Sequence, residues 1–302
     1  MNPTDPDSFE TYRRLMFSIA YRMLGSATEA EDIVQEAYLR YQAVAAGQIK
    51  SPKAFLSTIV TRLCLNQLQS ARVQRETYIG PWLPEPILTE TDERADPKLQ
   101  AEMHDSISFA FLVLLEELTP LERAVFLLRE VFDYDYDEIA AILGKDAAAC
   151  RQTFSRAKKH VAEHRPRFSP TPKAHRRLLG QFMQAIGGGN FDALTAMLAD
   201  DVTMWADGGG KARGAAIHPL QGREAVTRFL LASTRLMPAG AQAELAAVNG
   251  EMAMILRAGG KAFLVVSITV ADDQVREIRV VGNPDKLNWL SVPDVGLGQA
   301  AQ

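Results

Sequence analysis

Two short helices joined by a glycine turn, over residues 137–160, constrain this chain more than any other feature. Ile139 and Leu143 give the first helix an apolar stripe, and Gly144 is expected to end it in a left-handed conformation. The second helix carries apolar residues at spacings of four, three and four: Cys150, Phe154, Ala157 and Val161. Its opposite face is rich in donors: Arg151, Gln152, Ser155, Arg156 and Lys159. This arrangement is typical of a helix-turn-helix, whose second helix enters the DNA major groove.

The chemistry of that donor-rich face also favours DNA. Arginine and glutamine can make paired hydrogen bonds to base edges, while lysine and serine reach phosphates. From Arg151 to Arg177 there are nine lysines and arginines against one acid, Glu163. The alternative is an ordinary amphipathic hairpin with a solvated basic face, but a basic patch of this density favours phosphate binding.

The overall composition limits the other classes of function. A chain of 302 residues predicts two or three domains, and its net charge of -4 means that any DNA contact is local. Cys64 and Cys150 both lie in apolar helical patterns, so we expect two core thiols in a reducing cytoplasm. No spacing indicates a metal site, and we expect no cofactor. The polar, acidic N-terminus is no signal peptide, and no apolar run predicts a membrane span.

The first 76 residues predict an all-α domain. Its helices are expected over 9–24, from a capping box of Thr28 with Glu31, and from Ser51-Pro52 onward. The second helix presents a polar, mostly acidic face, read from its residues alone as a solvated surface. The third presents a polar, mildly basic face over residues 62–72.

Residues 77–99 read as a linker, with four prolines and no helical period. Tyr78, Trp82, Leu83 and Ile87 are large apolar residues, so we expect this segment to dock on a neighbouring domain or a partner. The alternative is an extended spacer with an exposed tryptophan. A second helical domain follows over 100–167, with a helix over 99–118 and a strong helix start at Thr119-Pro120 with Glu122.

After a second linker, 168–174, residues 175–290 predict an α+β domain with helices packed on a curved antiparallel sheet. Helices are expected over 175–186, 191–198 and 223–235. A strand leads into the glycines at 208–210, and four more are expected over 243–249, 251–258, 261–271 and 274–282. Three pairs of turn residues separate these four strands: Asn249-Gly250, Gly259-Gly260 and Asp272-Asp273. The sequence of the tail, residues 291–302, predicts no packed structure.

The first two domains resemble a bacterial extracytoplasmic-function (ECF) sigma factor, the small class of promoter-specificity subunits of RNA polymerase. The resemblance rests on AEDIVQEAYLR (30–40), SPKAFLSTIVTRLCLNQL (51–68) and residues 118–159. It implies that the clamp of core RNA polymerase is bound by Asp32, Val34, Gln35 and Glu36. It implies that the melted −10 promoter element is read by Arg62, Asn66, Gln69 and Arg72. The −35 element would be read by Arg151, Gln152, Ser155, Arg156 and Lys159. Many members carry an acid and a base at the positions of Asn66 and Gln69, so this chain departs from the family pattern there and the resemblance does not fix its exact −10 contacts.

The third domain resembles SnoaL-like cone folds, and three motifs resemble the ECF subgroup that carries such an extension. The first is WLPEP, comprising Trp82, Leu83, Pro84, Glu85 and Pro86. The second is DGGGK, comprising Asp207, Gly208, Gly209, Gly210 and Lys211. The third is NPDKL, comprising Asn283, Pro284, Asp285, Lys286 and Leu287. We expect Asn283 to cap a turn and Lys286 or Asp285 to reach the linker or DNA. Pairing of Asp207 with Lys211 is a further expectation.

Three hypotheses address the third domain. The favoured one is regulation, in which the domain docks on the sigma domains and the WLPEP linker. The second is sensing of a small molecule in the cone, with Trp205, Asp207, Lys211, His218 and Asn283 near its mouth. The third is catalysis, with Asp207 and His218 as an acid/base pair. A fold alone does not fix function, and one aspartate with one histidine is more often structural than catalytic, so the favoured interpretation is that the chain is not an enzyme.

A different class of protein also fits the helix-turn-helix: a DNA-binding regulator with a sensor or enzymatic C-terminal domain and no polymerase contact. Such a regulator needs a dimer interface to match paired half-sites. The sequence shows no sustained heptad for one. The EDIVQEAY segment and the 51–72 helix favour the sigma factor.

Overall fold

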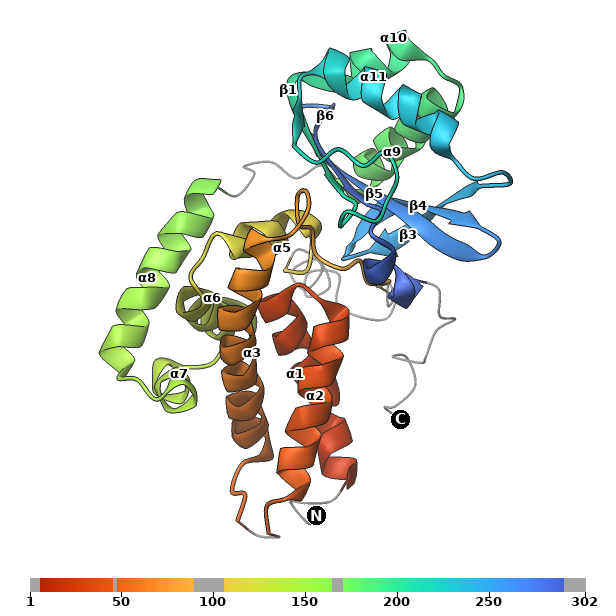
Figure 1. The fold of residues 1–302 in the computed structure, drawn as a ribbon. Coiled ribbons are helices and arrows are strands. Elements are labelled where there is room, and N and C mark those ends of the chain that lie inside the picture. The colour runs from red at the N-terminus through yellow and green to blue at the C-terminus, as the bar shows by residue number, and fades with distance from the viewer. Residues whose placement is uncertain (1–5, 46–47, 90–105, 165–170, 291–302) are drawn as a thin grey trace. The chain divides into compact units, whose positions relative to one another are not determined.

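The computed structural model describes residues 6–45, 48–89, 106–164 and 171–290, which form two compact units (Figure 1). The first unit comprises 1–77 and 110–165, and the second comprises 78–109 and 166–302. Several expectations lie outside the described residues: the helix start over 99–105, linker residues 90–99 and 168–170, and the tail from 291. The WLPEP segment belongs to the second unit.

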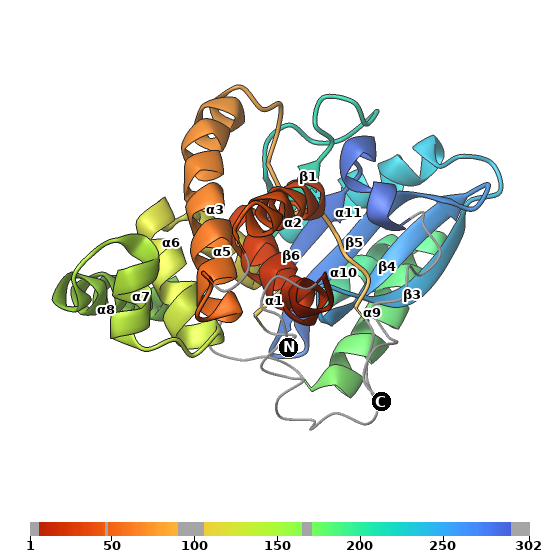
Figure 2. The same cartoon turned by 90° about the horizontal axis from the view of Figure 1, so that it is seen from below.

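Three helices pack together at the start of the first unit (Figures 1 and 2): α1 (Pro6–Leu24), α2 (Ala27–Gln42) and α3 (Pro52–Glu76). Gly25 ends α1 with a φ of 68°, a left-handed value that suits glycine. The expected capping box of Thr28 with Glu31 is wrong, because Ser26 caps α2 and accepts a hydrogen bond from the Glu29 amide at 3.1 Å. Ser26 leaves the Gly25 turn with extended backbone, so the helix begins before Thr28.

Five further helical segments complete the first unit: α5 (Phe109–Glu116), α6 (Pro120–Phe126), the π-helical η1 (Leu127–Val131), α7 (Tyr136–Leu143) and α8 (Ala147–His164). The capping box of Thr119 with Glu122 is confirmed, and so is the left-handed Gly144 between α7 and α8. Ile142 joins Ile139 in the core beneath the pair, and Leu143 packs against that core partly buried. The segments α7 and α8 therefore form the expected helix-turn-helix.

The two helical halves of the first unit, α1–α3 and α5–α8, contact each other directly. The Ser57 and Tyr134 hydroxyls share a buried hydrogen bond of 2.6 Å, and the Arg62 Nε donates to the Ile142 carbonyl at 3.0 Å. Arg123 is 3% exposed and donates to the Met23 carbonyl at 2.7 Å. Burial lowers the pKa of Arg123 to about 10, so it stays charged at neutral pH. In this structure the two halves therefore form one packed body.

The second unit holds a curved sheet of six strands in the order β2-β1-β6-β5-β4-β3. Its strands are β1 (Leu198–Asp207), β2 (Leu220–Gln221), β3 (Gln242–Val248), β4 (Glu251–Ala258), β5 (Lys261–Ala271) and β6 (Gln274–Val281). β3 to β6 form the expected antiparallel meander, and Asn249, Asp272 and Asp273 in its expected hairpin turns have positive φ angles. The sheet is mixed rather than purely antiparallel, because β1 pairs in parallel with β6. The chain crosses from β1 through a helix to the far sheet edge, and the meander then brings β6 back beside β1.

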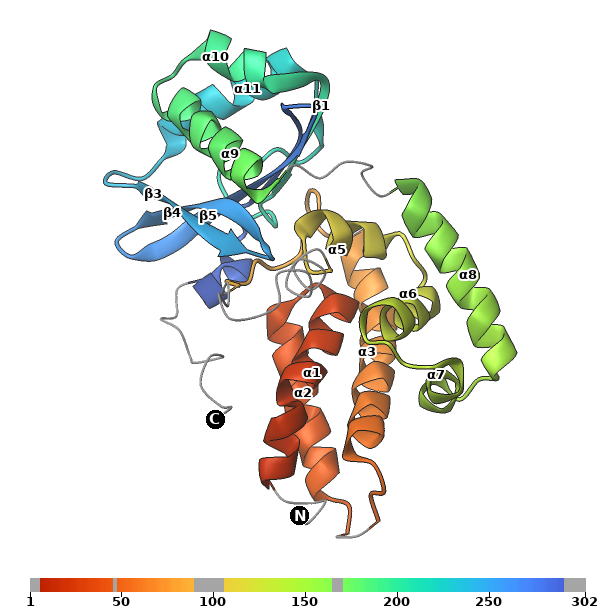
Figure 3. The same cartoon turned by 180° about the vertical axis from the view of Figure 1, so that it is seen from behind.

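Three helices cover one face of this sheet (Figure 3): α9 (Pro172–Gly187), α10 (Phe191–Met197) and α11 (Arg223–Ser233), which continues as the 3-10 turn η2 (Thr234–Leu236). Phe182, Leu194 and Val226 join the sheet residues in a single apolar core. Two short 3-10 turns follow β6, η3 (Pro284–Lys286) and η4 (Asn288–Leu290). In the part of the chain that the structure describes, no helix has the length and apolarity needed to cross a membrane.

Glu251 on β4 makes the stability of the second unit depend on pH. Burial raises the pKa of its carboxyl from 4.5 to about 7, and Arg279 offsets this only partly. Between those pH values the folded state binds more protons than the unfolded state, so stability falls as pH rises through the window. We expect Glu251→Gln to remove this dependence of the free energy of unfolding on pH. In the wild type the loss amounts to up to about 3 kcal/mol by pH 8. Urea unfolding at pH 5 and at pH 8 measures this change in the free energy of unfolding.

The control for this experiment is Glu224→Gln on the exposed surface of α11. That variant is expected to keep the wild-type slope. Parallel pH profiles for wild type and Glu251→Gln would contradict the assignment.

Candidate interfaces and the linker clasp

A buried carboxylate at the end of β1 organises the contacts between the linker and the C-terminal domain. Asp207 is 1% exposed. Its Oδ1 accepts a hydrogen bond from the Tyr78 hydroxyl, and its Oδ2 accepts from the Leu83 amide at 2.8 Å. The same Oδ2 lies 2.7 Å from the Nζ of Lys286. We call Tyr78, Leu83, Asp207, Asn283 and Lys286 the linker clasp.

Lys286 supplies the positive charge of the clasp. It is 6% exposed, and its ammonium group also donates to the Leu83 carbonyl. The Nζ lies 4.1 Å from the centroid of the Trp82 ring and 5.0 Å from that of Tyr78. A buried ammonium is tolerated when it is paired and hydrogen-bonded, and desolvation strengthens its attraction to aromatic faces. Lys286 thus binds the WLPEP segment through the Leu83 carbonyl and the Trp82 ring, and it binds β1 through the Asp207 carboxylate.

Asn283 fixes the geometry of the clasp from the other side. Its side-chain oxygen accepts from the Asp285 amide at 3.1 Å, which caps η3 as expected, and its Nδ2 donates to the Tyr78 hydroxyl at 2.9 Å. Burial, followed by the hydrogen bond to Asp207, raises the pKa of Tyr78 above its usual value. The phenol therefore stays protonated at neutral pH and keeps donating to the carboxylate.

The glycines after Asp207 are required by the close approach of the linker. A Cβ added at Gly209 would lie 2.3 Å from the Asn283 Nδ2 and 3.0 Å from the Tyr78 hydroxyl, and its φ is +56°. A Cβ at Gly210 would lie 2.9 Å from the Cδ1 of Ile79. Gly209 and Gly210 are therefore explained by packing against Tyr78 and Ile79, which precede WLPEP, whereas a Cβ at Gly208 would meet Ala215 and Ala212 in the loop that follows.

A second anchor holds the later part of the linker. Asn249, 0% exposed in the β3–β4 turn, accepts from the Ile87 amide at 3.0 Å and donates to the Ile107 carbonyl at 2.9 Å. Leu88 forms an isolated antiparallel bridge with Val248, and the Thr89 amide donates to the Ala247 carbonyl at 2.9 Å. The linker thus adds main-chain hydrogen bonds at the edge of the sheet.

The remaining motif residues are distributed around these anchors. Pro84, Glu85 and Pro86 are buried. Lys211 forms an ion pair with Asp285, in which both side chains are more than half exposed, so the expected pairing of Asp207 with Lys211 is wrong. Asp207 is instead reached by a lysine far along the chain, because η3 returns to the end of β1. His218 is exposed, while the Asp207 carboxylate is occupied within the clasp.

The candidate polymerase face lies on α2 in the first unit. Asp32 and Gln35 are exposed and Glu36 is half-buried. Val34 is 1% exposed and points into the core, so it does not reach this surface. Leu39, one turn further on, is 60% exposed. Asp32, Gln35 and Leu39 are therefore exposed side chains of the candidate polymerase face, whereas Val34 is not.

The candidate −10 residues lie on α3 and the candidate −35 residues on α8. Arg62, Asn66 and Gln69 are exposed, although Arg62 is bonded to the Ile142 carbonyl; of Arg72 the structure describes only the backbone. On α8 all the predicted −35 residues are exposed: Arg151, Gln152, Ser155, Arg156 and Lys159. The Arg151 guanidinium lies 5.6 Å from the Tyr136 ring centroid. The structure presents these donors on one solvent-facing side of the recognition helix.

Comparison with known proteins identifies the family to which this chain belongs. Residues 8–73 match the model of sigma-70 region 2, and residues 108–161 match that of sigma-70 region 4. The chain is 38% identical over 288 residues to the ECF RNA polymerase sigma factor SigJ of Mycobacterium tuberculosis, covering 92% of this chain and 91% of that protein. This chain belongs to the ECF family of RNA polymerase sigma factors.

Further similarities agree with this membership. The probable ECF sigma factor SigI of M. tuberculosis is 34% identical over 205 residues, covering 66% of this chain and 69% of its own. The crystal structure of M. tuberculosis SigJ is similar with a TM-score of 0.72 and 36% identity, covering 96% of this chain and 99% of that one. As in the sequence-based expectation, this ECF sigma factor combines helical sigma regions with a C-terminal α+β domain.

Two residues of this sigma factor, one in contact with the linker region and one exposed on α2, lie outside its sequence motifs. Asn249 reads as an ordinary hairpin residue next to glycine, yet it binds the linker on both sides of residues 88–106. Leu39 lies outside the apolar stripe of α2, and an apolar residue on the polar face of a helix is the signal that points to it.

Proposed function

We propose that this ECF sigma factor binds core RNA polymerase through α2, reads −35 and −10 promoter elements through α8 and α3, and is restrained by its own C-terminal domain. The clasp carries this proposal, because it holds the segment that connects the two DNA-reading halves. The polymerase performs the chemistry of RNA synthesis, so the sigma factor needs no catalytic residue. It would act in the bacterial cytoplasm.

Promoter geometry requires the halves of the first unit to separate. The −35 and −10 elements lie about 25 base pairs apart, which is about 85 Å of B-form DNA. In the structure α3 and α7 are joined by the bond from Arg62 to the Ile142 carbonyl. Helices in direct contact cannot reach both elements, and Arg62 is itself a predicted −10 residue. The packed state is therefore a resting state.

The linker sets how far the halves can separate. Residues 78–109 can span about 105–115 Å when fully extended, enough to connect the two elements. In the clasped state the segment is bound at Tyr78, Leu83, Ile87 and Ile107. Both ends of this segment are then bound to the C-terminal domain, so the distance that the segment can span is much shorter. Release of the clasp is the step that permits promoter engagement.

The contact between Ser57 and Tyr134 gives a test of the resting state. Tyr134→Phe removes one of these hydroxyls and leaves that of Ser57, which is 0% exposed in the closed state, without this hydrogen bond. A net loss of about 1 kcal/mol of closed-state stability is expected. The open fraction then rises about fivefold, and so does the apparent affinity for core polymerase. Fluorescence anisotropy of labelled protein measures this affinity, and a weaker affinity for a folded variant would contradict the resting-state assignment.

In vitro transcription tests the proposed function as a whole. Full-length protein, a truncation after Arg165 and a truncation after Val281 would each be added to core polymerase at sub-saturating concentration, on a promoter of its own regulon found by sequencing transcripts after induction. The shorter proteins lack Lys286, and we expect them to initiate more strongly than full-length protein. If no protein initiates while the full-length chain binds duplex DNA alone, the regulator without polymerase contact replaces this proposal.

A further inference from the structure

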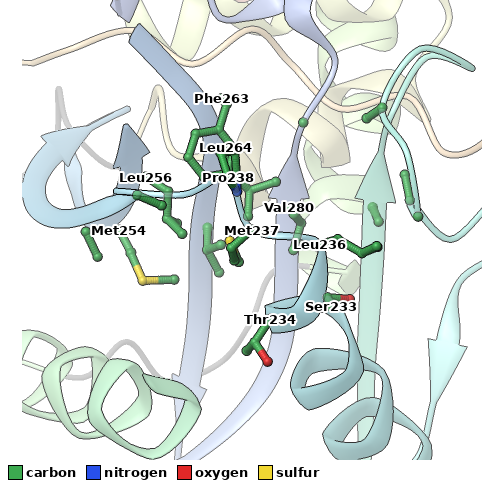
Figure 4. Close-up of a pocket in the computed structure, with 18 of the residues that line it drawn as sticks. Ser233, Thr234, Leu236, Met237, Pro238, Met254, Leu256, Phe263, Leu264 and Val280 are labelled. Atoms are coloured by element: carbon green, nitrogen blue, oxygen red, sulfur yellow. The ribbon is translucent and has the colours of Figure 1, made fainter. Parts of the chain in front are cut away.

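The C-terminal domain contains a cavity of about 1040 Å³ beside the clasp. Figure 4 shows its wall, with Leu236 and Met237 from the end of η2 facing Leu256 and Val280 from the sheet. Protein interiors are close-packed, with few voids larger than a water molecule. A volume of this size is at the upper end of the range for small-molecule sites. The cavity is therefore large enough for an organic ligand.

The interior of the cavity is predominantly apolar. Met183, Met204, Met237 and Met254 line it, together with leucine, valine and phenylalanine side chains. Methionine is flexible and polarizable, so such a wall adapts to an apolar body of varied shape. The hydroxyl of Ser233 donates within its own helix, to the Phe229 carbonyl at 2.8 Å. This interior selects for an apolar group rather than for a sugar or a nucleotide.

The charged residues that line the cavity favour an anionic end on the ligand. They are Lys211, Arg213, Lys261 and one acid, Asp207. The Asp207 charge is balanced by Lys286 and the Lys211 charge by Asp285. Arg213 and Lys261 are both exposed and add two positive charges to the lining. Arginine in particular matches a carboxylate with two parallel hydrogen bonds.

We infer that the cavity binds an amphipathic carboxylic acid, with its apolar body among the methionines and its carboxylate near Arg213 or Lys261. The regulatory consequence of this binding, unlike the binding itself, rests on the proposed function. Asp207, Pro284 and Leu287 line the cavity and also belong to the clasp or flank Lys286. The amides of Gly282 and Asn283 both donate to the Asp207 carbonyl, at 2.8 and 2.9 Å. A ligand against this wall contacts the backbone that positions the clasp, so its binding biases linker release.

Isothermal titration calorimetry on the full chain tests the ligand class with two acids and their neutral counterparts. Decanoate is compared with decanol, and 1-naphthoate with 1-naphthylmethanol. We expect at least one acid to bind, with a Kd at least tenfold below that of its alcohol. Arg213→Gln with Lys261→Gln is expected to abolish that preference. The charge-matched control, Lys173→Gln with Arg228→Gln, changes exposed residues outside the cavity and is expected to keep it.

Two variants that fill the cavity from different walls test its location. Val280→Phe fills it from β6 and Ser233→Leu from α11, and each is expected to weaken acid binding at least tenfold while the circular dichroism spectrum stays native. The use of two sites keeps the test valid if one variant misfolds. Failure of both acids to bind, equal binding of acid and alcohol, or unchanged binding by both folded variants would overturn the inference.

Hydrogen exchange of residues 78–89 measures the coupling separately. A saturating acid is expected to change the exchange rate of this segment at least threefold. Binding without any change in exchange would overturn the coupling and leave the cavity as a ligand site only. Transcription without ligand, as described above, tests the proposed function independently, so failure of one proposal is distinguishable from failure of the other.

Discussion

Lys286→Met is expected to release the linker and to increase initiation by sub-saturating protein. The substitution keeps the aliphatic part of the side chain but removes the charge that binds Asp207, the Leu83 carbonyl and the Trp82 ring. Removing one partner of a buried ion pair costs about 3–5 kcal/mol, because the other charge is left unpaired. The amide of Leu83 is then expected to exchange on the order of a hundredfold faster. Hydrogen exchange measures the release, and in vitro transcription measures its consequence.

Lys211→Met is the matched control for this prediction. It changes the same residue type in the DGGGK motif, but its ion pair with Asp285 is exposed. Exposed pairs contribute at most about 1 kcal/mol, so linker exchange is expected to stay near wild type. If Lys286→Met is folded and its linker amides exchange at the wild-type rate, the clasp does not hold the linker as proposed.

The second large effect is expected from charge reversal on the recognition helix. Arg151→Glu with Arg156→Glu replaces two exposed cations of α8, each of which can contribute about 1–3 kcal/mol through base contacts. We expect −35-dependent binding and transcription to fall at least a hundredfold, while affinity for core polymerase stays within twofold. Holoenzyme binding to promoter fragments with intact and scrambled −35 elements measures the loss.

A reciprocal variant makes this test specific. Asp32→Ala with Gln35→Ala changes the exposed face of α2 and is expected to weaken core binding, and Leu39→Ala is expected to add to that loss. Loss of both core binding and DNA binding by the α8 variant would indicate misfolding. Unchanged core affinity in the α2 variant would rule out that face as the polymerase contact.

Local sequence patterns predict most of the secondary structure of this chain. The turn residues Asn249-Gly250 and Asp272-Asp273, set between alternating apolar residues, define the meander of β3 to β6. Proline at the first helical position and a capping glutamate define the start of α6. In each case the residues that determine the structure lie within one or two turns of each other, so short-range chemistry suffices.

Contacts between distant segments are less predictable. The parallel pairing of β1 with β6 depends on a crossover through α11, which no local pattern encodes. Two motif lysines could pair with Asp207, and only the path of the chain after β6 brings the distant Lys286 rather than the adjacent Lys211 to its carboxylate. The helical pattern of α2 marks Ile33 as core but leaves the neighbouring Val34 ambiguous, and packing against α1 and α3 buries it.

Hydrogen exchange of the linker in the free protein and in the complex with core polymerase tests the central proposal most directly. In the free protein we expect the amides of Leu83 and Ile87, which donate to Asp207 and Asn249, to exchange slowly. In a holoenzyme that initiates transcription we expect them to exchange rapidly, while Ile255 and Val266 in the sheet stay protected. Equal protection of the linker in the free protein and in an active holoenzyme would contradict release of the clasp.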